Sequence, residues 1–474
     1  LSRVAVLVAG AICIGLCLFG IRGRMGYNPI KVSQAYYCED PFLNQLGVNP
    51  VFNLLTSTLD DNRKENRTLH LMSEEDALSK VQKYLHRQGI DRLSPIARKV
   101  EREGTPNRRN VVLVFMESMS ANLMGTFGSD KKLTPYLDSL YQQSLSFSHF
   151  YSSGIHTNHG IYSTLYSFPA IMKRNAMKGS VIPVYSGLPT VLQENGYCNL
   201  FFMTHESQYD NMNAFLRTNG FDEIYAQENY PSEKVVNSFG VQDDFMYQYA
   251  LPILNERAGT GNPFFSVLLS ISNHPPYVIP PYFHPHSDVL EEQIVEYADW
   301  SIRQFMQAAE KQPWFDNTIF VFLGDHGKMV GTPECEMPQS YNHIPLMIYG
   351  KDIKPGVYDG FGGQVDVSPT LLGLLNISYL QNNFGVNLLE EERPCMFFTA
   401  DNLIGARDSV NMFIYSPDSQ QEFKYKLEEG KLHAATGTDE EAFRNLKDYC
   451  FSMLQSTESL VKEHKTLDKV SVKK

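Results

Sequence analysis

Two adjacent residues, Asp325 and His326, follow an apolar run directly and carry side chains that bind divalent metal ions. The run from Ile319 to Leu323 has no polar interruption, which predicts a strand buried on both faces of a parallel sheet. Gly324 and Gly327 flank the pair, so the backbone can turn sharply and a ligand can approach closely. Taken alone, the pair has a second interpretation, in which Asp325 caps the next helix.

Three further apolar runs also end in polar residues, namely Glu117-Ser118, Thr204-His205-Glu206 and Ser272-Asn273-His274. Because the carboxyl ends of parallel strands share one edge of a sheet, we expect all four strand ends to converge. Glu117, Asp325 and His326 would then supply carboxylate oxygens and an imidazole nitrogen. This set suits Mn²⁺ or Zn²⁺ better than Mg²⁺, and it leaves a position open for a nucleophile or a substrate oxygen.

A hydroxyl-rich segment, residues 153–164, supplies a candidate nucleophile. Thr157 begins a helical pattern that runs to Tyr166. A hydroxyl at a helix amino terminus faces free N–H groups and the positive end of the helix dipole, which stabilise a phosphate group. A bound metal ion would lower the pKa of that hydroxyl and make it nucleophilic. The pattern leaves open the alternative that Thr157 only caps the helix.

The elements that must position these residues alternate between strands and helices. Strand patterns at 110–116, 196–203, 263–271, 319–323 and 344–349 are separated by helical patterns, notably 187–194 and 291–309. We therefore predict an α/β fold, with a mainly parallel central sheet flanked by helices. Residues 397–474 have short alternating runs and then a polar helix from about Glu440, which predicts a small C-terminal antiparallel sheet plus a helix.

The amino-terminal stretch from Val4 to Ile21 is nearly unbroken apolar sequence, bounded by Arg3, Arg22 and Arg24. Its length is just sufficient to span a bilayer. A cleaved signal peptide is the competing interpretation, but no Ala-x-Ala site follows. We expect residues 1–24 to be a membrane anchor helix, the last of several, and the local arginines leave its orientation open.

The rest of the chain is predicted to form three parts. Residues 25–105 read as a connecting arm with helices near 50–55 and 73–86, the second after a Ser-x-x-Asp cap. Residues 106–396 form the catalytic domain, and residues 397–474 form the C-terminal subdomain and tail. The boundary near 104–106 is a Gly-Thr-Pro sequence.

Composition excludes two classes of function. The net charge of −12, without a Lys/Arg cluster, argues against a nucleic-acid partner. No CxxC or Cys/His ligand spacing occurs, which argues against a cysteine-based metal site. One disulfide remains open among the cysteines outside the apolar stretch, which are Cys38, Cys198, Cys335, Cys395 and Cys450.

The polar strand ends and their neighbours also occur in an order that resembles a known family. The order is Glu117-Ser118, a Thr-Pro-x-Leu helix at 134–137, Thr157 in a Gly-flanked loop, Asn-His-Pro-Pro-Tyr at 273–277, Gly-Asp-His-Gly at 324–327, Asn-His-Ile-Pro-Leu at 342–346 and Val-Asp-Val-Ser-Pro-Thr-Leu-Leu at 365–372. From residue 110 to 376 the chain resembles the sulfatase-like branch of the alkaline phosphatase superfamily. Within that branch it resembles the lipoteichoic acid synthase type of phosphoglycerol transferase.

The resemblance implies roles for individual residues. It implies an extracytoplasmic catalytic domain on a membrane anchor, with Mn²⁺ as the usual ion and Zn²⁺ or Mg²⁺ as alternatives. His274 would be a general acid or base near the phosphoryl group, and His205 a second histidine of the substrate pocket. The implied metal ligands are Glu117, Thr157, Asp325 and His326, with Thr157 also the nucleophile.

One segment departs from the family pattern. Where Gram-positive synthases carry Phe-Trp-Asn-Arg, this chain has Tyr209-Asp210-Asn211-Met212, so Asp210 and Asn211 become the candidate substrate-binding residues here. A methionine cannot hold a phosphate bidentately as an arginine does. The resemblance therefore implies the transfer chemistry but leaves the polymerase activity open.

Together these features predict transfer of a phosphoglycerol group through a phospho-threonine intermediate on Thr157. The donor would be a phospholipid, most simply phosphatidylglycerol, and the acceptor a hydroxyl of a glycan or glycolipid. The alternatives are a phosphoethanolamine transferase, a hydrolase of the sulfatase or phosphodiesterase type, and a catalytically inactive binding domain. A second metal site that involves His343 and Asp366 is a further alternative.

Overall fold

The computed structural model of the chain describes residues 2–25, 29–37, 41–61, 68–90, 93–178, 182–428, 430–435 and 440–467. Its centre is an eight-stranded sheet with the strand order β11-β3-β10-β9-β2-β8-β4-β5. Strand β10 is antiparallel to its neighbours β9 and β3, whereas the other neighbouring strands of this sheet are parallel. The predicted α/β fold with a mainly parallel sheet is confirmed. The strands are β2 (Asn110–Met116), β3 (Leu145–Tyr151), β4 (Cys198–Met203), β5 (Glu223–Tyr225), β8 (Phe264–Leu269), β9 (Thr318–Gly324), β10 (Leu346–Tyr349) and β11 (Gly356–Gly363).

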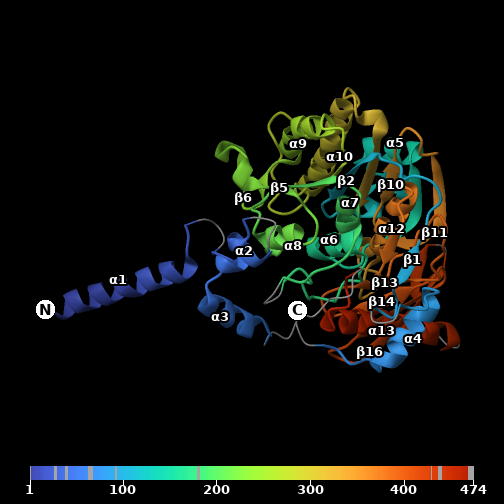
Figure 1. Cartoon of the computed structure of the whole chain (residues 1–474), viewed down its shortest axis with the longest axis horizontal. Coiled ribbons are helices and arrows are strands. Elements are labelled where there is room, and N and C mark those ends of the chain that lie inside the picture. The colour runs from blue at the N-terminus through green and yellow to red at the C-terminus, as the bar shows by residue number, and fades with distance from the viewer. Residues whose placement is uncertain are drawn as a thin grey trace.

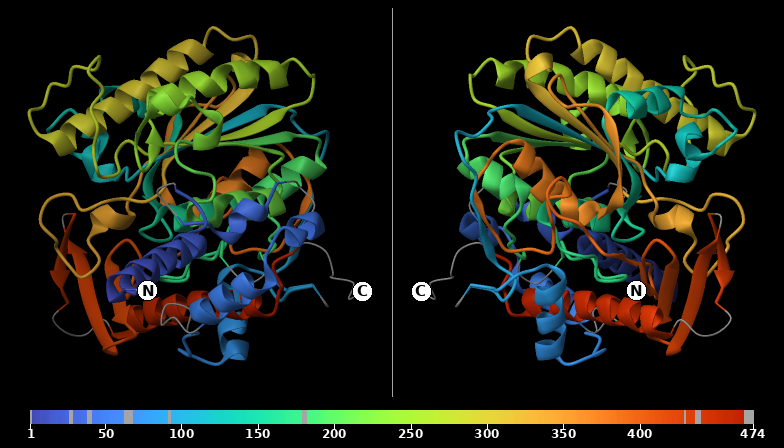
Figure 2. Two further views of the ribbon diagram at one scale, coloured as in Figure 1. Left: turned by 90° about the vertical axis from the view of Figure 1, so that its left-hand side faces the viewer. Right: turned by 90° about the vertical axis from the view of Figure 1, so that its right-hand side faces the viewer.

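Helices cover both faces of the sheet, as Figure 2 shows. Side chains of β2 alternate between the two faces, because successive residues of a strand point in opposite directions. Val111 and Leu113 enter one core, and Val112 and Val114 enter the other. The first core also takes residues from α6 (Thr157–Tyr166), α7 (Leu188–Glu194), α8 (Met212–Thr218) and α12 (Val367–Leu374). The second takes residues from α5 (Pro135–Gln143), α9 (Asp243–Ala258) and α10 (Leu290–Ala309).

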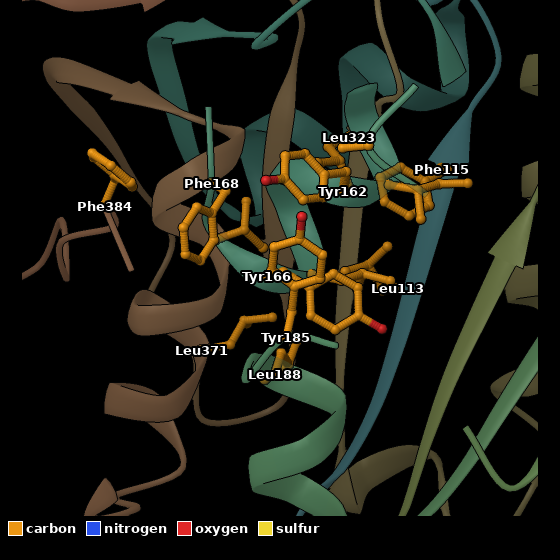
Figure 3. Close-up of a cluster of buried hydrophobic side chains, with 14 of the residues drawn as sticks. Leu113, Phe115, Tyr162, Tyr166, Phe168, Tyr185, Leu188, Leu323, Leu371 and Phe384 are labelled. Atoms are coloured by element: carbon orange, nitrogen blue, oxygen red, sulfur yellow. The ribbon is translucent and has the colours of Figure 1, made fainter. Parts of the chain in front are cut away.

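An aromatic cluster fixes helix α6 against the first core (Figure 3). Tyr162 and Tyr166 project from α6, and the ring of Tyr162 lies 5.2 Å from that of Tyr185. The ring of Tyr166 lies 5.2 Å from that of Phe215 on α8. Because these large side chains are fully buried, they restrict how α6 can shift along the sheet. The first residue of this helix is Thr157.

Three strands of the central sheet, namely β3, β5 and β11, were not predicted from the sequence. Strand β3 carries serines and a histidine among its apolar residues, and β11 is rich in glycine, so neither shows the uninterrupted apolar run of β2 or β9. Both lie at one side of the sheet, where burial is less complete than in the central strands. Two short strands, β6 (Val235–Asn237) and β7 (Gly240–Val241), form a separate hairpin, and α11 (Gln339–Asn342) is a single turn.

The predicted C-terminal antiparallel sheet and helix are also confirmed. The sheet consists of β13 (Met396–Thr399), β14 (Ile404–Arg407), β15 (Asn411–Ser416), β16 (Gln421–Glu428) and β17 (Lys431–Ala434). Helix α13 (Glu440–Lys462) is partly exposed at its start, where Phe443 and Leu446 are buried, and it is buried at every position from Tyr449 to Leu460.

The amino-terminal helix α1 (Arg3–Arg22) projects away from the rest of the molecule (Figure 1). Within the described residues it is the one helix long and apolar enough to cross a membrane. It is followed by the short 3₁₀ helix η1 (Val32–Ala35) and by the helices α2 (Pro41–Leu46) and α3 (Pro50–Asp61).

The second half of the predicted connecting arm is joined to the body. Helix α4 (Glu74–Tyr84) has the expected cap, in which the backbone N–H of Asp76 donates to Ser73 Oγ. Val81 and Ile96 belong to the first core, and β1 (Arg98–Val100) pairs with β12 (Tyr379–Gln381). The proposed limits of the domains remain predictions.

The six described cysteines are all unpaired. The disulfide left open by the sequence is therefore not formed among them, and Cys38 lies outside the described residues.

Candidate active site

The four polar strand ends meet at one edge of the sheet, as predicted. Strands β9, β2, β8 and β4 are parallel neighbours in this order, so their carboxyl ends lie side by side. The backbone N–H of Ser118 donates to Asp325 Oδ1 at 2.9 Å. The amide of Asn273 donates to the carbonyl oxygen of Glu117 at 3.0 Å. These bonds tie the ends of β2, β8 and β9 into one structure.

Glu117, Asp325 and His326 offer ligand atoms that all lie within 4.8 Å of one another. Asp325 Oδ1 is engaged by backbone N–H groups, whereas its Oδ2 is buried without a hydrogen-bond partner in the structure. His326 Nδ1 lies 2.8 Å from the carbonyl oxygen of Gly327, which can only accept, so Nε2 is left for the site. This is the one such group found in the described part of the chain.

The electrostatics of this group favour a bound cation. Glu117 is fully buried, and burial together with the neighbouring Asp325 carboxylate raises its pKa well above the usual range. Two buried carboxylates that face each other repel, and a divalent cation between them would remove that repulsion. The orphaned Oδ2 of Asp325 and the mixed oxygen and nitrogen donors therefore fit a divalent metal ion.

Thr157 lies beside this group as the first residue of α6. Its Oγ1 is 3.5 Å from Glu117 Oε2. The residue in the capping position is His156, so the alternative in which Thr157 only caps the helix does not hold. The backbone N–H groups of Thr157 and Asn158 have no acceptor among the described residues. They are therefore able to donate to a bound anion.

A close approach of backbones holds α6 at this place. A Cβ atom on Gly160 would lie 2.2 Å from the carbonyl oxygen of Asp325, so only glycine fits. Gln364 connects the loop after β9 with the loop before α6. Its amide donates to the Asp325 carbonyl at 2.6 Å, and its Oε1 accepts from the N–H of Ser153. The sequence gave no signal for Gln364, because a single glutamine before a helix has no distinctive spacing.

His274 and His205 both lie at the site, on the side toward β4. His274 Nδ1 is 2.6 Å from the carbonyl oxygen of Pro275, so the neutral ring presents Nε2 as an acceptor. His205 is buried, with its Nδ1 at 3.0 Å from the Glu206 carbonyl. Burial lowers the pKa of both histidines below the usual value, which favours their neutral forms. The ring of Phe239 lies 4.1 Å from that of His274.

Asp210 and Asn211 occupy different places. Asp210 lies beside the start of α6, where its carboxylate accepts from Asn158 at 3.2 Å and from Lys178 at 3.1 Å. Burial alone would raise the pKa of Asp210, but Lys178 and these hydrogen bonds lower it overall. The amide nitrogen of Asn211 instead donates to the carbonyl oxygen of Met177. Of the two candidates, Asp210 is the one placed next to Thr157.

Lys328 is a further residue of the site that the sequence analysis missed. Its Nζ donates to Asn273 Oδ1 at 2.6 Å and lies 5.7 Å from the centre of the Tyr277 ring. It forms no ion pair with a carboxylate of the described residues. Burial lowers the pKa of Lys328 to about 8. The sequence feature that could have identified Lys328 is its position directly after Gly-Asp-His-Gly.

His343 and Asp366, the candidates for a second metal site, have other partners in the structure. His343 is half-buried, and its Nε2 lies 2.9 Å from the carbonyl oxygen of Ser148. Asp366 forms a bidentate ion pair with Arg393, at 2.7 and 2.6 Å. Both side chains serve the packing of the fold, and neither belongs to a group of potential ligands in the described residues.

Comparison with known proteins agrees with this geometry. The family model for sulfatases matches residues 109–377, which is more than half of the chain. The chain belongs to the sulfatase family. The match begins one residue before β2 and ends after α12, so it covers the central sheet and the residues of the site.

Sequence relatives of this sulfatase-family protein include lipoteichoic acid synthases. It is 25% identical over 362 residues to the lipoteichoic acid synthase-like protein YvgJ of Bacillus subtilis, an alignment that covers 69% of this chain and 56% of the relative. It is 24% identical over 400 residues to the lipoteichoic acid synthase of Staphylococcus aureus, covering 74% and 58%. The chain thus spans somewhat more than half the length of these relatives.

Solved structures show the same fold. An alkaline phosphatase superfamily protein of Vibrio parahaemolyticus matches with a TM-score of 0.75 and 25% identity, over 83% of this chain and 97% of that one. The lipoteichoic acid synthase LtaP of Listeria monocytogenes matches with a TM-score of 0.64 and 21% identity, over 81% and 98%.

Proposed function

We propose that this sulfatase-family protein is a membrane-anchored phosphoglycerol transferase whose catalytic domain is extracytoplasmic. It takes the phosphoglycerol group from a phospholipid, most simply phosphatidylglycerol, and transfers it to a hydroxyl of a glycan or glycolipid. The observation that carries the proposal is the position of the Thr157 hydroxyl, at a helix amino terminus and beside Glu117. The names of its relatives support the class of reaction.

Glu117, Asp325 and His326, together with Thr157, would hold a divalent metal ion. Mn²⁺ is the expected ion, with Zn²⁺ and Mg²⁺ as alternatives, given the donor atoms. Such an ion, when bound, lowers the pKa of a hydroxyl and offsets charge on phosphoryl oxygens.

In the first half of the reaction, Thr157 Oγ1, which has released its proton to solvent, attacks the phosphorus of the donor. A bond forms between Oγ1 and phosphorus while the bond from phosphorus to the diacylglycerol oxygen breaks. The free N–H groups at the start of α6 face the nonbridging oxygens, where negative charge accumulates. His274 in its protonated form supplies the proton that the departing diacylglycerol oxygen takes up.

In the second half, the acceptor hydroxyl attacks the phospho-threonine and restores Thr157. Because Nδ1 of His274 donates to the Pro275 carbonyl, the neutral ring offers Nε2 to the proton of the attacking hydroxyl. His274 has this neutral form once it has given its proton to the diacylglycerol oxygen, and burial, which lowers its pKa, stabilises that form. His205 and Asp210 line the same side and are the candidate contacts to the transferred group.

The test is mass analysis of the purified full chain after exposure to bilayers of labelled phosphatidylglycerol. We expect a phosphoglycerol adduct on Thr157, and a fall in turnover of about a thousandfold or more in Thr157→Ala with Mn²⁺ binding retained. Thr260→Ala, an exposed threonine far from the site, is the matched control.

Other outcomes would support the alternatives. A phosphoethanolamine adduct from labelled phosphatidylethanolamine would indicate a phosphoethanolamine transferase. Release of glycerol phosphate to water without an acceptor would indicate a hydrolase. Full turnover in Thr157→Ala would exclude the mechanism, and binding without turnover by the unsubstituted chain would indicate a binding domain.

A further inference from the structure

The segment that follows α1 is attached to the rim of the active site. Arg24, two residues after the end of α1, forms an ion pair with Glu206, and both side chains are largely buried. Glu206 follows His205, whose ring lies in the site. Since two residues of extended chain span at most about 7 Å, this wall of the site lies close to the end of the membrane helix.

A second contact fixes the segment that follows α1 at a point further along the chain. Helix η1 rests on α8, and the amide of Asn213 on α8 donates to the carbonyl oxygen of Tyr36 at 2.8 Å. Tyr36 is buried in the first core. Because α8 begins directly after Asp210 and Asn211, the membrane-proximal segment is anchored on the element that carries the candidate substrate contacts. Figure 1 shows α2 and α8 next to each other.

The rim formed in this way carries a cluster of charges. Arg24 pairs with Glu206, and Lys178 pairs with Asp210 at 3.1 Å. Lys31 is half buried among these four groups, each of which acts on its pKa. With three cations and two carboxylates the cluster has one net positive charge, which matches the single negative charge of a phosphodiester.

The cluster leads directly to the nucleophile. Asp210, which pairs with Lys178, also accepts from Asn158, and Asn158 follows Thr157 at the start of α6. A phosphate bound by Lys31 and Lys178 therefore lies close to the amino terminus of α6, which would bind it for reaction. We call Arg24, Lys31, Lys178, Glu206 and Asp210 the rim cluster.

Helix α3 provides a separate observation about the same side of the molecule. Val51, Leu55 and Leu59 repeat at a spacing of four, so they lie on one face, and they are 67%, 61% and 67% exposed. Figure 2, in its left view, shows the blue amino-terminal helices together on the side from which α1 projects. An apolar helical face next to a membrane helix is typical of a helix that lies in the bilayer interface.

We propose that the rim cluster is the entrance for a phospholipid donor that stays in the bilayer while its headgroup enters the site. Arg24, Lys31 and Lys178 receive the headgroup phosphate, and α3 rests on the bilayer surface beside the entrance. The acyl chains then never cross water, which would be strongly unfavourable. This inference rests on the proposed function and adds the route and the physical state of the donor.

The test compares a bilayer donor with a water-soluble one, using the full chain in proteoliposomes. The donors are long-chain phosphatidylglycerol in the bilayer and glycerophosphoglycerol in solution, which both give the same adduct on Thr157. The measured quantity is the ratio of kcat/KM for the bilayer donor to kcat/KM for the soluble donor. In Lys31→Ala and Lys178→Ala we expect this ratio to fall about tenfold, chiefly through KM, because only the bilayer donor must pass the rim cluster, whereas the soluble donor can reach Thr157 directly from water.

Matched variants separate this effect from general damage. Lys173→Ala removes an exposed lysine of the same loop as Lys178 and should leave the ratio unchanged. Lys31→Arg should restore the ratio, because it restores the charge. Replacement of Val51, Leu55 and Leu59 by asparagine should lower the ratio, whereas Val357→Asn, an exposed valine on β11, should not.

The outcomes distinguish the two proposals. If the adduct forms from both donors but the ratio is unchanged in both lysine variants, the entrance is wrong and the proposed function stands. If neither donor gives an adduct on Thr157, the proposed function fails and the entrance fails with it. A fall in the ratio that Lys31→Arg does not reverse would also overturn the assignment to charge.

Discussion

At the scale of single residues, the site is defined by which atom of each side chain is already engaged. Asp325 uses Oδ1 to accept from backbone N–H groups and leaves Oδ2 without a hydrogen-bond partner among the described residues, and His326 uses Nδ1 and leaves Nε2. The remaining atoms point to a common centre because the first bonds restrict the side-chain rotamers. A site built in this way is oriented before any ligand binds, which reduces the entropy lost on binding.

Lys328 is expected to bind a nonbridging oxygen of the substrate phosphate. Its hydrogen-bond partner is the neutral amide of Asn273, and within the part of the chain that the structure describes it forms no ion pair. Because a hydrogen bond to a charged group contributes about 1.5–3 kcal/mol, Lys328→Ala should lower kcat/KM by about ten- to a hundredfold. Steady-state transfer of labelled phosphoglycerol measures this.

Two controls accompany that measurement. Mn²⁺ affinity should be retained in Lys328→Ala, since lysine is not a ligand, and Lys311→Ala should be fully active because Lys311 is exposed on the surface. Unchanged kcat/KM in Lys328→Ala would show that the ammonium group does not touch the substrate.

The sequence alone was sufficient to predict that Glu117, Asp325 and His326 lie close together, because each follows a strand whose apolar run is uninterrupted. It was insufficient for Gln364 and for the link from Lys328 through Asn273 to Glu117. These contacts depend on side-chain directions across loops that are far apart in the sequence, and no periodic pattern reports such directions.

At the scale of elements, the position of α6 relative to β9 decides whether Thr157 is in place. Gly160→Ala introduces a Cβ that would lie 2.2 Å from the backbone oxygen of Asp325, so the helix must move. A displacement of about 1 Å can reduce turnover by about a hundredfold, and we expect a loss of that order. Turnover and circular dichroism of the purified variant measure activity and folding separately.

The control for this change is Gly356→Ala. A Cβ on Gly356 meets no atom within 4 Å, so stability and turnover should be unchanged. If Gly160→Ala keeps full turnover, the close approach of α6 and β9 is not required for the reaction.

The contact between α13 and the segment before α4 should make stability depend on pH. Glu458 on α13 accepts the backbone N–H of Leu69, and burial raises the pKa of Glu458 to about 7. The unfolded chain releases this proton near pH 4.3, whereas the folded chain retains it to about pH 7. The contribution of Glu458 to stability is therefore present at low pH and is lost as the pH rises through this window.

Glu458→Gln keeps an acceptor for Leu69 but cannot titrate. We expect its denaturant midpoint to fall less than that of the unsubstituted chain between about pH 5 and pH 8. Identical pH dependence in the two chains would show that Glu458 is ionised throughout. Glu440→Gln, an exposed glutamate on the same helix, is the control.

Most elements were predictable from periodicity, and the exceptions have a physical reason. Strand β10 was predicted as a strand, but its antiparallel direction depends on the two loops that bracket it and not on its own residues. Strands β3 and β11 lack a continuous apolar run because they pair at the edge region of the sheet. Tertiary pairing, which a local pattern does not contain, determined these elements.

At the scale of the whole molecule, a bound ion would join β2, β9 and α6. Because ligand binding to the folded state adds to the free energy of unfolding, Mn²⁺ at a hundred times its Kd should add about 2.7 kcal/mol. Calorimetry of the chelator-treated chain with and without Mn²⁺ measures the corresponding rise in Tm. The rise should be absent in Asp325→Asn and retained in Glu256→Gln, an exposed control. A Tm that does not respond to Mn²⁺ would count against the metal site.

The joining of α4 to α13 also has a consequence for how the protein is made. Leu69 and Glu458, which share a hydrogen bond, are separated by 389 positions, and α4 contacts α13 along its length. Synthesis proceeds from the amino terminus, so α4 and β1 emerge long before their partners β12 and α13 exist. Until these partners exist, the core face of α4, with Ala77 and Val81, stays uncovered. The region around α4 thus stays without its native partners until almost the whole chain has been made.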